Sequence, residues 1–247
     1  MDNNKQLKSY KVWDRSTRWF HWINVICVIS LIFVGTAIFN GKAIGVSGDG
    51  KILLKTIHVY IGYLFVFNLI WRLICGFIGN KYAKWINIFP ITRNYWQSLK
   101  DYKTASQSGK TPTYLGHNPI GKLMVTLLIA LLTTQAITGL VIAGTDLYMP
   151  PFGESIKEWV AETDQQGNAK EIKAGSKEGV NKEAYKEMRE FRKPYIETHV
   201  ILYYLLMLAI LIHIIFVVRS EIVENNGLIS AMFSGKKTLA KKPEDLD

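Results

Sequence analysis

The sequence has little cysteine and little charge for its length. Its 247 residues include two cysteines, Cys27 and Cys75, each inside an apolar run. Two isolated cysteines exclude a disulfide framework, a cysteine-based metal site and a C-x-x-C-H motif for covalent haem attachment. Charged residues make up only 20% and hydrophobic residues 49%, with a mean hydropathy of +0.09. This balance excludes a disordered chain and makes an integral membrane protein the first hypothesis.

Four apolar stretches are long enough to cross a bilayer, whose hydrocarbon core needs about 20 residues of helix. Three of them, 19–41, 123–145 and 198–218, contain no Asp, Glu, Lys or Arg. The fourth, 56–71, continues past Arg72, a side chain long enough to reach the interface. We therefore predict an all-α, integral membrane four-helix bundle forming one domain over 1–247, with spans at about 19–41, 56–79, 121–145 and 195–219. The length of the first span and the aromatic cluster WFHW at its start disfavour a cleaved signal peptide.

The distribution of positive charge predicts the orientation. Five basic residues precede or open the first span, and eight lie in 72–122 against one acidic residue, Asp101. The connection 146–194 has nine basic and ten acidic residues. The positive-inside rule then places both chain termini in the cytoplasm. This accounts for the net charge of +10 without nucleic acid as a partner.

Two connections are expected on the outer face. One is a short glycine-rich turn at 41–50, and the other is the extracytoplasmic segment 146–194. The longer segment contains PPFGESIKEWVAE and NKEAYKEMREFRK, two candidate short amphipathic helices joined by a Gly-, Lys- and Glu-rich stretch. A connection of this length is either a solvated flap or a docking surface for an extracytoplasmic partner.

Four of the five histidines fall inside the spans at matching depths. His21 and His213 lie near the inner ends of the first and fourth spans, and His58 and His199 near the outer ends of the second and fourth. His199 and His213 are 14 residues apart, about 40° short of four full turns, so both project from nearly one face, roughly 21 Å apart along the axis. Ionisable residues within membrane spans indicate function.

Two imidazoles at each depth favour a haem held between helices by two histidines. Zinc is a poor alternative because each level lacks a third or fourth ligand. A single histidine in a span can also serve only to hydrogen-bond a neighbouring helix.

Small residues and cations near the spans fit such a cofactor. Small residues in the spans allow either a flat ring to lie close to the backbone or the helices to pack closely in the ordinary way. They are Gly35, Gly62, Gly139, Ala143 and Gly144. The candidates to neutralise haem propionates are Arg18, Arg72 and Lys55.

His117 lies in the loop GHNPIGK, immediately before the third span. Asn118 and Pro119 are ordinary residues for a helix start. The functional alternative is that the loop supplies polar donors to a quinone head group at the cytoplasmic membrane surface.

These motifs together resemble a known family. The matching stretches are RWFHW (18–22), H-x3-G-Y continuing through IWR to FIGNKYAKW (58–85), GHNPIGK (116–122), the H-x13-H of the fourth span and RSEIVENNGLISAMFSGKK (219–237). The chain is similar to the b-type cytochrome subunit of membrane-bound nickel–iron uptake hydrogenases, within the bacterial di-haem cytochromes b that include the formate dehydrogenase gamma subunit.

The resemblance implies a respiratory-chain subunit with two non-covalent haems b, which exchanges electrons between an extracytoplasmic oxidoreductase and membrane quinone. The iron–sulfur small subunit of a hydrogenase is the first candidate partner. A multihaem cytochrome c or a molybdenum enzyme is the alternative, because 146–194 is longer than we expect of the hydrogenase subunit. The family's quinone pocket maps onto His117, Asn118 and Gly121, with His213 nearby. The alternative from a different functional class is a haem-free membrane anchor or transporter.

Overall fold

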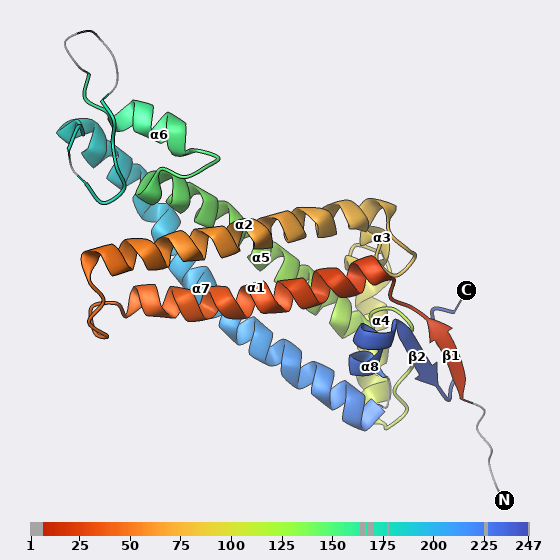
Figure 1. Ribbon diagram of the computed structural model, residues 1–247. Coiled ribbons are helices and arrows are strands. Elements are labelled where there is room, and N and C mark those ends of the chain that lie inside the picture. The colour runs from red at the N-terminus through yellow and green to blue at the C-terminus, as the bar shows by residue number, and fades with distance from the viewer. Residues whose placement is uncertain (1–6, 164–165, 167–169, 177, 225–226, 247) are drawn as a thin grey trace, which may run out of the picture. The chain divides into compact units, whose positions relative to one another are not determined.

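Four long helices dominate the computed structural model, which describes residues 7–163, 166, 170–176, 178–224 and 227–246. They are α1 (Arg15–Phe39), α2 (Gly48–Ile78), α5 (Pro119–Leu147) and α7 (Lys182–Glu224) (Figure 1). Each is long and apolar enough to span a membrane. The prediction of an all-α membrane bundle with four spans is confirmed.

The membrane helices keep many large apolar side chains on their surfaces. Phe33, Phe67 and Phe77 are 72 to 75% exposed, although such side chains are normally buried in a soluble protein. In a bilayer this exposure is favourable because lipid chains replace water around the rings. All backbone polar groups inside the bilayer must be bonded within the segment, and a helix does this.

Two expected boundaries differ from the structure. The turn expected at 41–50 is shorter, because α2 already begins at Gly48. The stretch NKEAYKEMREFRK does not form a separate helix: it is the beginning of α7, which runs for 43 residues with Pro194 in its interior. At 1.5 Å per residue α7 is about 65 Å long, roughly twice the hydrocarbon thickness.

Short elements lie in the connection between α2 and α5 and near the two ends of the chain. They are α3 (Trp85–Ile88), α4 (Tyr95–Gln107), α8 (Leu228–Ser234) and an antiparallel pair of strands, β1 (Lys8–Lys11) with β2 (Lys236–Leu239). The strand pair joins the two ends of the chain, with Lys8 opposite Leu239 and Lys11 opposite Lys236 (Figure 1). A small core supports this pair and consists of Val12, Trp13, Leu115, Ala231 and Leu239.

Internal contacts divide the chain into two compact units. The first comprises Met1–Asn24, Asn68–Ala130 and Leu206–Asp247, and the second Val25–Phe67 and Leu131–Leu205. His21, His117 and His213 belong to the first, and His58 and His199 to the second. The prediction of one domain over 1–247 stays a prediction.

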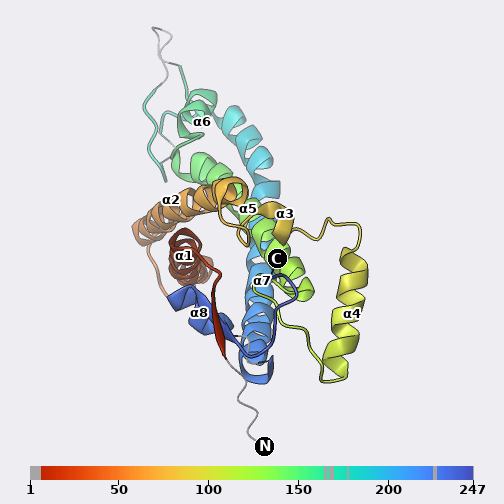
Figure 2. The same ribbon diagram turned by 90° about the vertical axis from the view of Figure 1, so that its right-hand side faces the viewer.

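The segment 146–194 has a folded core of its own. Helix α6 (Gly153–Val160) confirms the first of its two candidate helices and lies beside the beginning of α7 in both views (Figure 2). A β-bridge pairs Ala161 with Val180. The buried side chains are Tyr148, Ile156, Val160, Ile172, Val180 and Met188. In its described residues the segment is therefore more ordered than a solvated flap.

Candidate haem and quinone sites

His58 on α2 and His199 on α7 face each other within the second unit. Their ring centroids are 6.4 Å apart, with ring planes inclined by 71°. Metal–nitrogen bonds of about 2 Å to two opposed imidazoles separate the ring centroids by about 6 Å. The spacing of this pair therefore fits two imidazoles that would hold one haem iron between them.

Two glycines let the helices approach these rings. A Cβ built on Gly35 lies 3.3 Å from His58 Cε1, and one on Gly139 lies 3.2 Å from His199 Cε1. Both distances are shorter than ordinary van der Waals contact, so a side chain at either position would press on an imidazole. Of the small residues identified in the sequence, these are the two where an added Cβ would meet a candidate ligand.

Hydrogen bonds reach both nitrogens of His199. Its Nδ1 lies 2.9 Å from Thr138 Oγ1, and its Nε2 lies 3.1 Å from the amide nitrogen of Gln135. The Nδ1 of His58 is buried and has no hydrogen-bond partner. A buried, unpartnered ring nitrogen is uncommon in proteins, and at this position no protein hydrogen bond holds the ring.

His21 on α1 and His213 on α7 form the second pair, within the first unit. They lie close enough to interact electrostatically. His21 Nδ1 is buried without a hydrogen-bond partner, as in His58. Each pair expected from the sequence therefore lies within one unit. The identity of the four ligands stays a prediction.

The two arginines suggested for haem propionates are both partly unpaired. Arg72 is only 5% exposed, its guanidinium lies 4.3 Å from the Trp85 ring centroid, and its Nη1 is buried without a partner. Arg18 donates from Nη1 to the Phe233 carbonyl, while its Nε is buried and unpartnered. A buried cation needs a compensating anion or acceptor. Each of these arginines can therefore still donate a hydrogen bond to a carboxylate.

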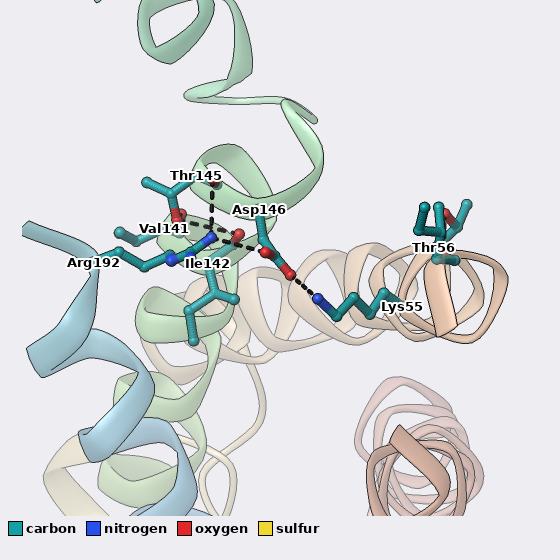
Figure 3. Close-up of polar contacts among 8 residues, drawn as sticks. Lys55, Thr56, Val141, Ile142, Thr145, Asp146 and Arg192 are labelled. Atoms are coloured by element: carbon teal, nitrogen blue, oxygen red, sulfur yellow. Dashed lines mark hydrogen bonds and ion pairs between the residues drawn. The ribbon is translucent and has the colours of Figure 1, made fainter. Parts of the chain in front are cut away.

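The third candidate for propionate binding, Lys55, is already paired. It forms an ion pair with Asp146, which also accepts from Arg192 Nη1 at 2.8 Å (Figure 3). Arg192 donates further to the Thr145 carbonyl at 3.2 Å. This arrangement ties α2, α5 and α7 together in the second unit, and the charge of Lys55 is neutralised by protein rather than available to a propionate.

The loop before α5 combines a partly buried histidine with a conventional helix cap. Asn118 Oδ1 accepts from the Gly121 backbone N–H at 2.7 Å, and its amide donates to the Tyr102 hydroxyl at 2.8 Å. Asn118 and Gly121 thus form the helix start, the ordinary alternative considered from the sequence. Both polar ends of the Asn118 side chain are bonded within the protein, which leaves His117 as the ligand candidate of the loop.

His117 packs against Trp13, with ring centroids 5.1 Å apart. Burial, followed by the nearby charges of Lys237, Arg72 and Lys122 and by His213, lowers the pKa of His117 to about 3. The imidazole is therefore neutral at physiological pH and lies near one of the candidate haem ligands.

Sequence reasoning missed the residues that hold this loop. Lys237 is 1% exposed and donates to the carbonyls of Tyr114 and Gly116, and burial lowers its pKa to about 8. The Asp245 carboxylate accepts from the N–H groups of Leu115 and Gly116. Both residues lie in a polar tail whose composition gave no sign that it folds back over the loop.

Among the described residues, no three His, Cys, Asp or Glu side chains are grouped to hold a metal ion. Paired imidazoles without a third protein ligand do not suit zinc, but they suit an iron whose other four ligands come from a porphyrin. Four membrane helices with facing imidazoles are typical of the class of membrane b-type cytochromes.

Comparison with known proteins agrees with this class. The family model described as prokaryotic cytochrome b561 matches residues 12–235, and the chain belongs to this family. Membership in this family makes the chain a membrane cytochrome b of electron transfer.

The curated relatives are similar at low identity. The chain is 31% identical over 123 residues to the "Probable Ni/Fe-hydrogenase 1 B-type cytochrome subunit" of Escherichia coli, a match that covers 46% of the chain and only about half (52%) of that relative. It is 21% identical to the corresponding Cupriavidus necator subunit and 23% identical to that of Azotobacter vinelandii, over at least 94% of the chain and about nine-tenths of each relative. No solved structure matches the chain significantly.

Proposed function

We propose that the chain holds two haems b and transfers electrons between an extracytoplasmic oxidoreductase and the quinone pool of a bacterial inner membrane. The observation that carries this proposal is the opposed pair His58 and His199, whose ring centroids lie 6.4 Å apart, a spacing at which both imidazoles could bind one iron. His21 and His213 form the second pair, on the cytoplasmic side in the orientation that we propose. When bound, each haem supplies a one-electron Fe(III)/Fe(II) couple.

The protein residues bind and orient these groups. The glycines at 35 and 139 admit the imidazoles of His58 and His199, and helix packing fixes both rings. Arg72 and Arg18 supply unpaired N–H groups for propionates of the haem in the first unit. The apolar environment excludes water from the four imidazoles and favours their neutral, ligating form.

The loop 116–118 supports quinone binding. His117 stays neutral because its pKa is far below physiological pH, so one ring nitrogen can donate a hydrogen bond to a quinone oxygen. Asn118 and Gly121 contribute by fixing the beginning of α5, and Lys237 by holding the carbonyls of Tyr114 and Gly116. The cytoplasmic position of this loop follows from the positive-inside rule.

The partner that we propose is the iron–sulfur subunit of a nickel–iron hydrogenase. The names of the curated relatives support this partner. The folded core of 146–194 supplies a defined extracytoplasmic surface for it. A multihaem cytochrome c or a molybdenum enzyme is the alternative, for which the length of this segment is the supporting observation.

Spectroscopy of four single variants tests the ligand pairing. In the purified full-length chain, His58→Ala and His199→Ala should each remove the same low-spin haem signal. His21→Ala and His213→Ala should each remove the other signal. Loss of signals in a different pairing, or a colourless wild-type protein, would contradict the proposal and favour a haem-free anchor.

A second assay tests the partner. The isolated complex with its extracytoplasmic subunits should reduce its haems under hydrogen and pass electrons to a quinone analogue. Haems that stay oxidised under hydrogen, but are reduced by formate or by a reduced cytochrome c, would assign the alternative partner.

A further inference from the structure

Thr138, one turn from Gln135 on α5, makes two kinds of hydrogen bond at once. Thr138 is buried, with only 5% of its surface exposed. Its Oγ1 is 3.0 Å from the carbonyl oxygens of Thr134 and Gln135, and 2.9 Å from His199 Nδ1. All these partners belong to the second unit.

The number of hydrogens on the Thr138 hydroxyl determines which atom donates in each of these contacts. A hydroxyl has one hydrogen and two lone pairs, while a backbone carbonyl can only accept. The single hydrogen of Thr138 is therefore directed to the helix carbonyls. Its lone pair faces His199, so the hydrogen in that contact must be carried by Nδ1.

A neutral imidazole has one N–H, so a hydrogen on Nδ1 leaves the lone pair on Nε2. The contact on the other side of the ring agrees with this, because the amide nitrogen of Gln135 can only donate and lies 3.1 Å from Nε2. The local hydrogen bonds thus place the available lone pair of His199 on Nε2.

We propose that Thr138 is a positioning residue that holds His199 in the tautomer with the hydrogen on Nδ1 and the lone pair on Nε2. The inference rests on the proposed function, in which Nε2 binds haem iron. A Cβ built on Gly139, the next residue, would lie 3.2 Å from Cε1 of the same ring, so two successive positions of α5 restrict its rotation. The hydrogen of Nδ1 is held by a hydroxyl that the helix backbone itself orients.

The two imidazoles of this pair are therefore unequal. Nδ1 of His199 has a hydrogen-bond acceptor, whereas Nδ1 of His58 is buried and has no partner. Hydrogen bonding of the second ring nitrogen raises the basicity of a ligating histidine. With a haem bound, His199 would be the stronger electron donor to the iron, and its bond to Thr138 would stabilise the ferric state and lower the midpoint potential.

A purely structural role for Thr138 predicts a different result. Threonines in helices commonly bond the carbonyl four residues earlier. Thr126, three turns earlier on α5, makes this bond to Lys122 at 2.8 Å and provides a matched control. If only the helix bond matters, Thr126→Val and Thr138→Val will have similar effects.

The test compares wild type, Thr138→Val, Thr138→Ser and Thr126→Val as full-length proteins, by haem titration of the haem-free chain and by redox titration of the loaded chain. Thr138→Val should weaken binding of one haem by about 10- to 100-fold and raise its midpoint potential, with the other haem unchanged. Thr138→Ser should restore both values, and Thr126→Val should match wild type. Equal shifts of both haems, no shift in Thr138→Val, or failure of Thr138→Ser to restore them would overturn the inference.

Nitrogen NMR of the haem-free wild type, labelled with ¹⁵N-histidine, separates this inference from the proposed function and needs no folded variant at position 138. The resonance that disappears in His199→Ala should be that of the Nδ1–H tautomer. An Nε2–H tautomer would overturn the role of Thr138 even if two haems bind. An Nδ1–H tautomer in a chain that binds no haem would support the tautomer assignment and contradict the proposed function alone.

Discussion

At the scale of single residues, the glycines beside the paired imidazoles have the most direct consequences. We expect Gly139→Ala to displace His199, because the added Cβ would lie 3.2 Å from its Cε1. The expected result is a changed low-spin spectrum or reduced occupancy of one haem. Gly48→Ala is the control, since its Cβ would meet no atom within 4 Å. Identical haem spectra for wild type and Gly139→Ala would contradict the close packing of this ring.

His117 should make stability depend on pH. Its pKa is lowered to about 3 in the folded chain, whereas the unfolded imidazole titrates near 6.5. Between these values the unfolded state binds the additional proton, so the contribution of His117 to stability decreases as pH falls below about 6.5.

We expect His117→Gln to lose less thermal stability than wild type between about pH 7 and pH 5. The measurement is the unfolding midpoint in detergent at each pH, compared between the two proteins so that the effects of the other histidines cancel. Parallel acid profiles for both proteins would show that His117 is not buried in its neutral form.

The sequence identifies residues whose type is unusual for their surroundings, and it misses residues whose role depends on folding. Histidines in charge-free spans stand out, and their depths follow from helix geometry. Thr138 does not stand out, because threonines are frequent in membrane helices and only the position of His199 gives its hydroxyl a second partner. Lys237 is likewise one of several lysines near the chain end until folding buries it.

At the scale of elements, the ion pairs of Asp146 connect three membrane helices. Asp146→Asn would leave the cations Lys55 and Arg192 without a counter-charge in a partly buried position. We expect a loss of about 1–3 kcal/mol, or several degrees in the unfolding midpoint. The control is Glu154→Gln, which removes an ion pair whose carboxylate is 81% exposed. Its effect should stay within about 0.5 kcal/mol, and equal effects of both variants would refute a stabilising role for Asp146.

The folded core of 146–194 should be disruptable without an effect on haem binding. Met188→Ala removes a side chain with 0% exposure from that core, and such truncations lower stability by about 2–5 kcal/mol. Limited proteolysis should cleave the variant faster within this segment, while its haem spectrum stays that of wild type. Unchanged proteolysis would mean that this core does not hold the segment together.

Element boundaries were less predictable than element types. Charge-free length identified three spans, and the stretch 56–71 reached the length that the bilayer imposes only by continuing past Arg72. It could not show that α7 begins at Lys182, since that part is polar and contains Pro194, a residue that usually ends helices. The strand pair β1–β2 brings together residues more than 200 positions apart in the sequence, a contact that local patterns do not encode.

At the scale of the whole molecule, the charge distribution predicts the topology. Reporter fusions at the N and C termini should both be active only in the cytoplasm, and a reporter inserted in 161–181 only outside it. The physical reason is the excess of basic residues in the N-terminal segment and in 72–122. A C-terminal reporter active outside the cytoplasm would require an odd number of spans and would invalidate the assignment of inner and outer haems.

The account as a whole depends on two pairs of histidines that each hold one haem. The most direct test is the ratio of haem b to protein in the purified full-length chain, measured by the pyridine haemochrome assay. The account predicts two non-covalent haems b per chain, both low-spin with two imidazole ligands. One haem per chain, or none after expression with sufficient haem, would contradict it.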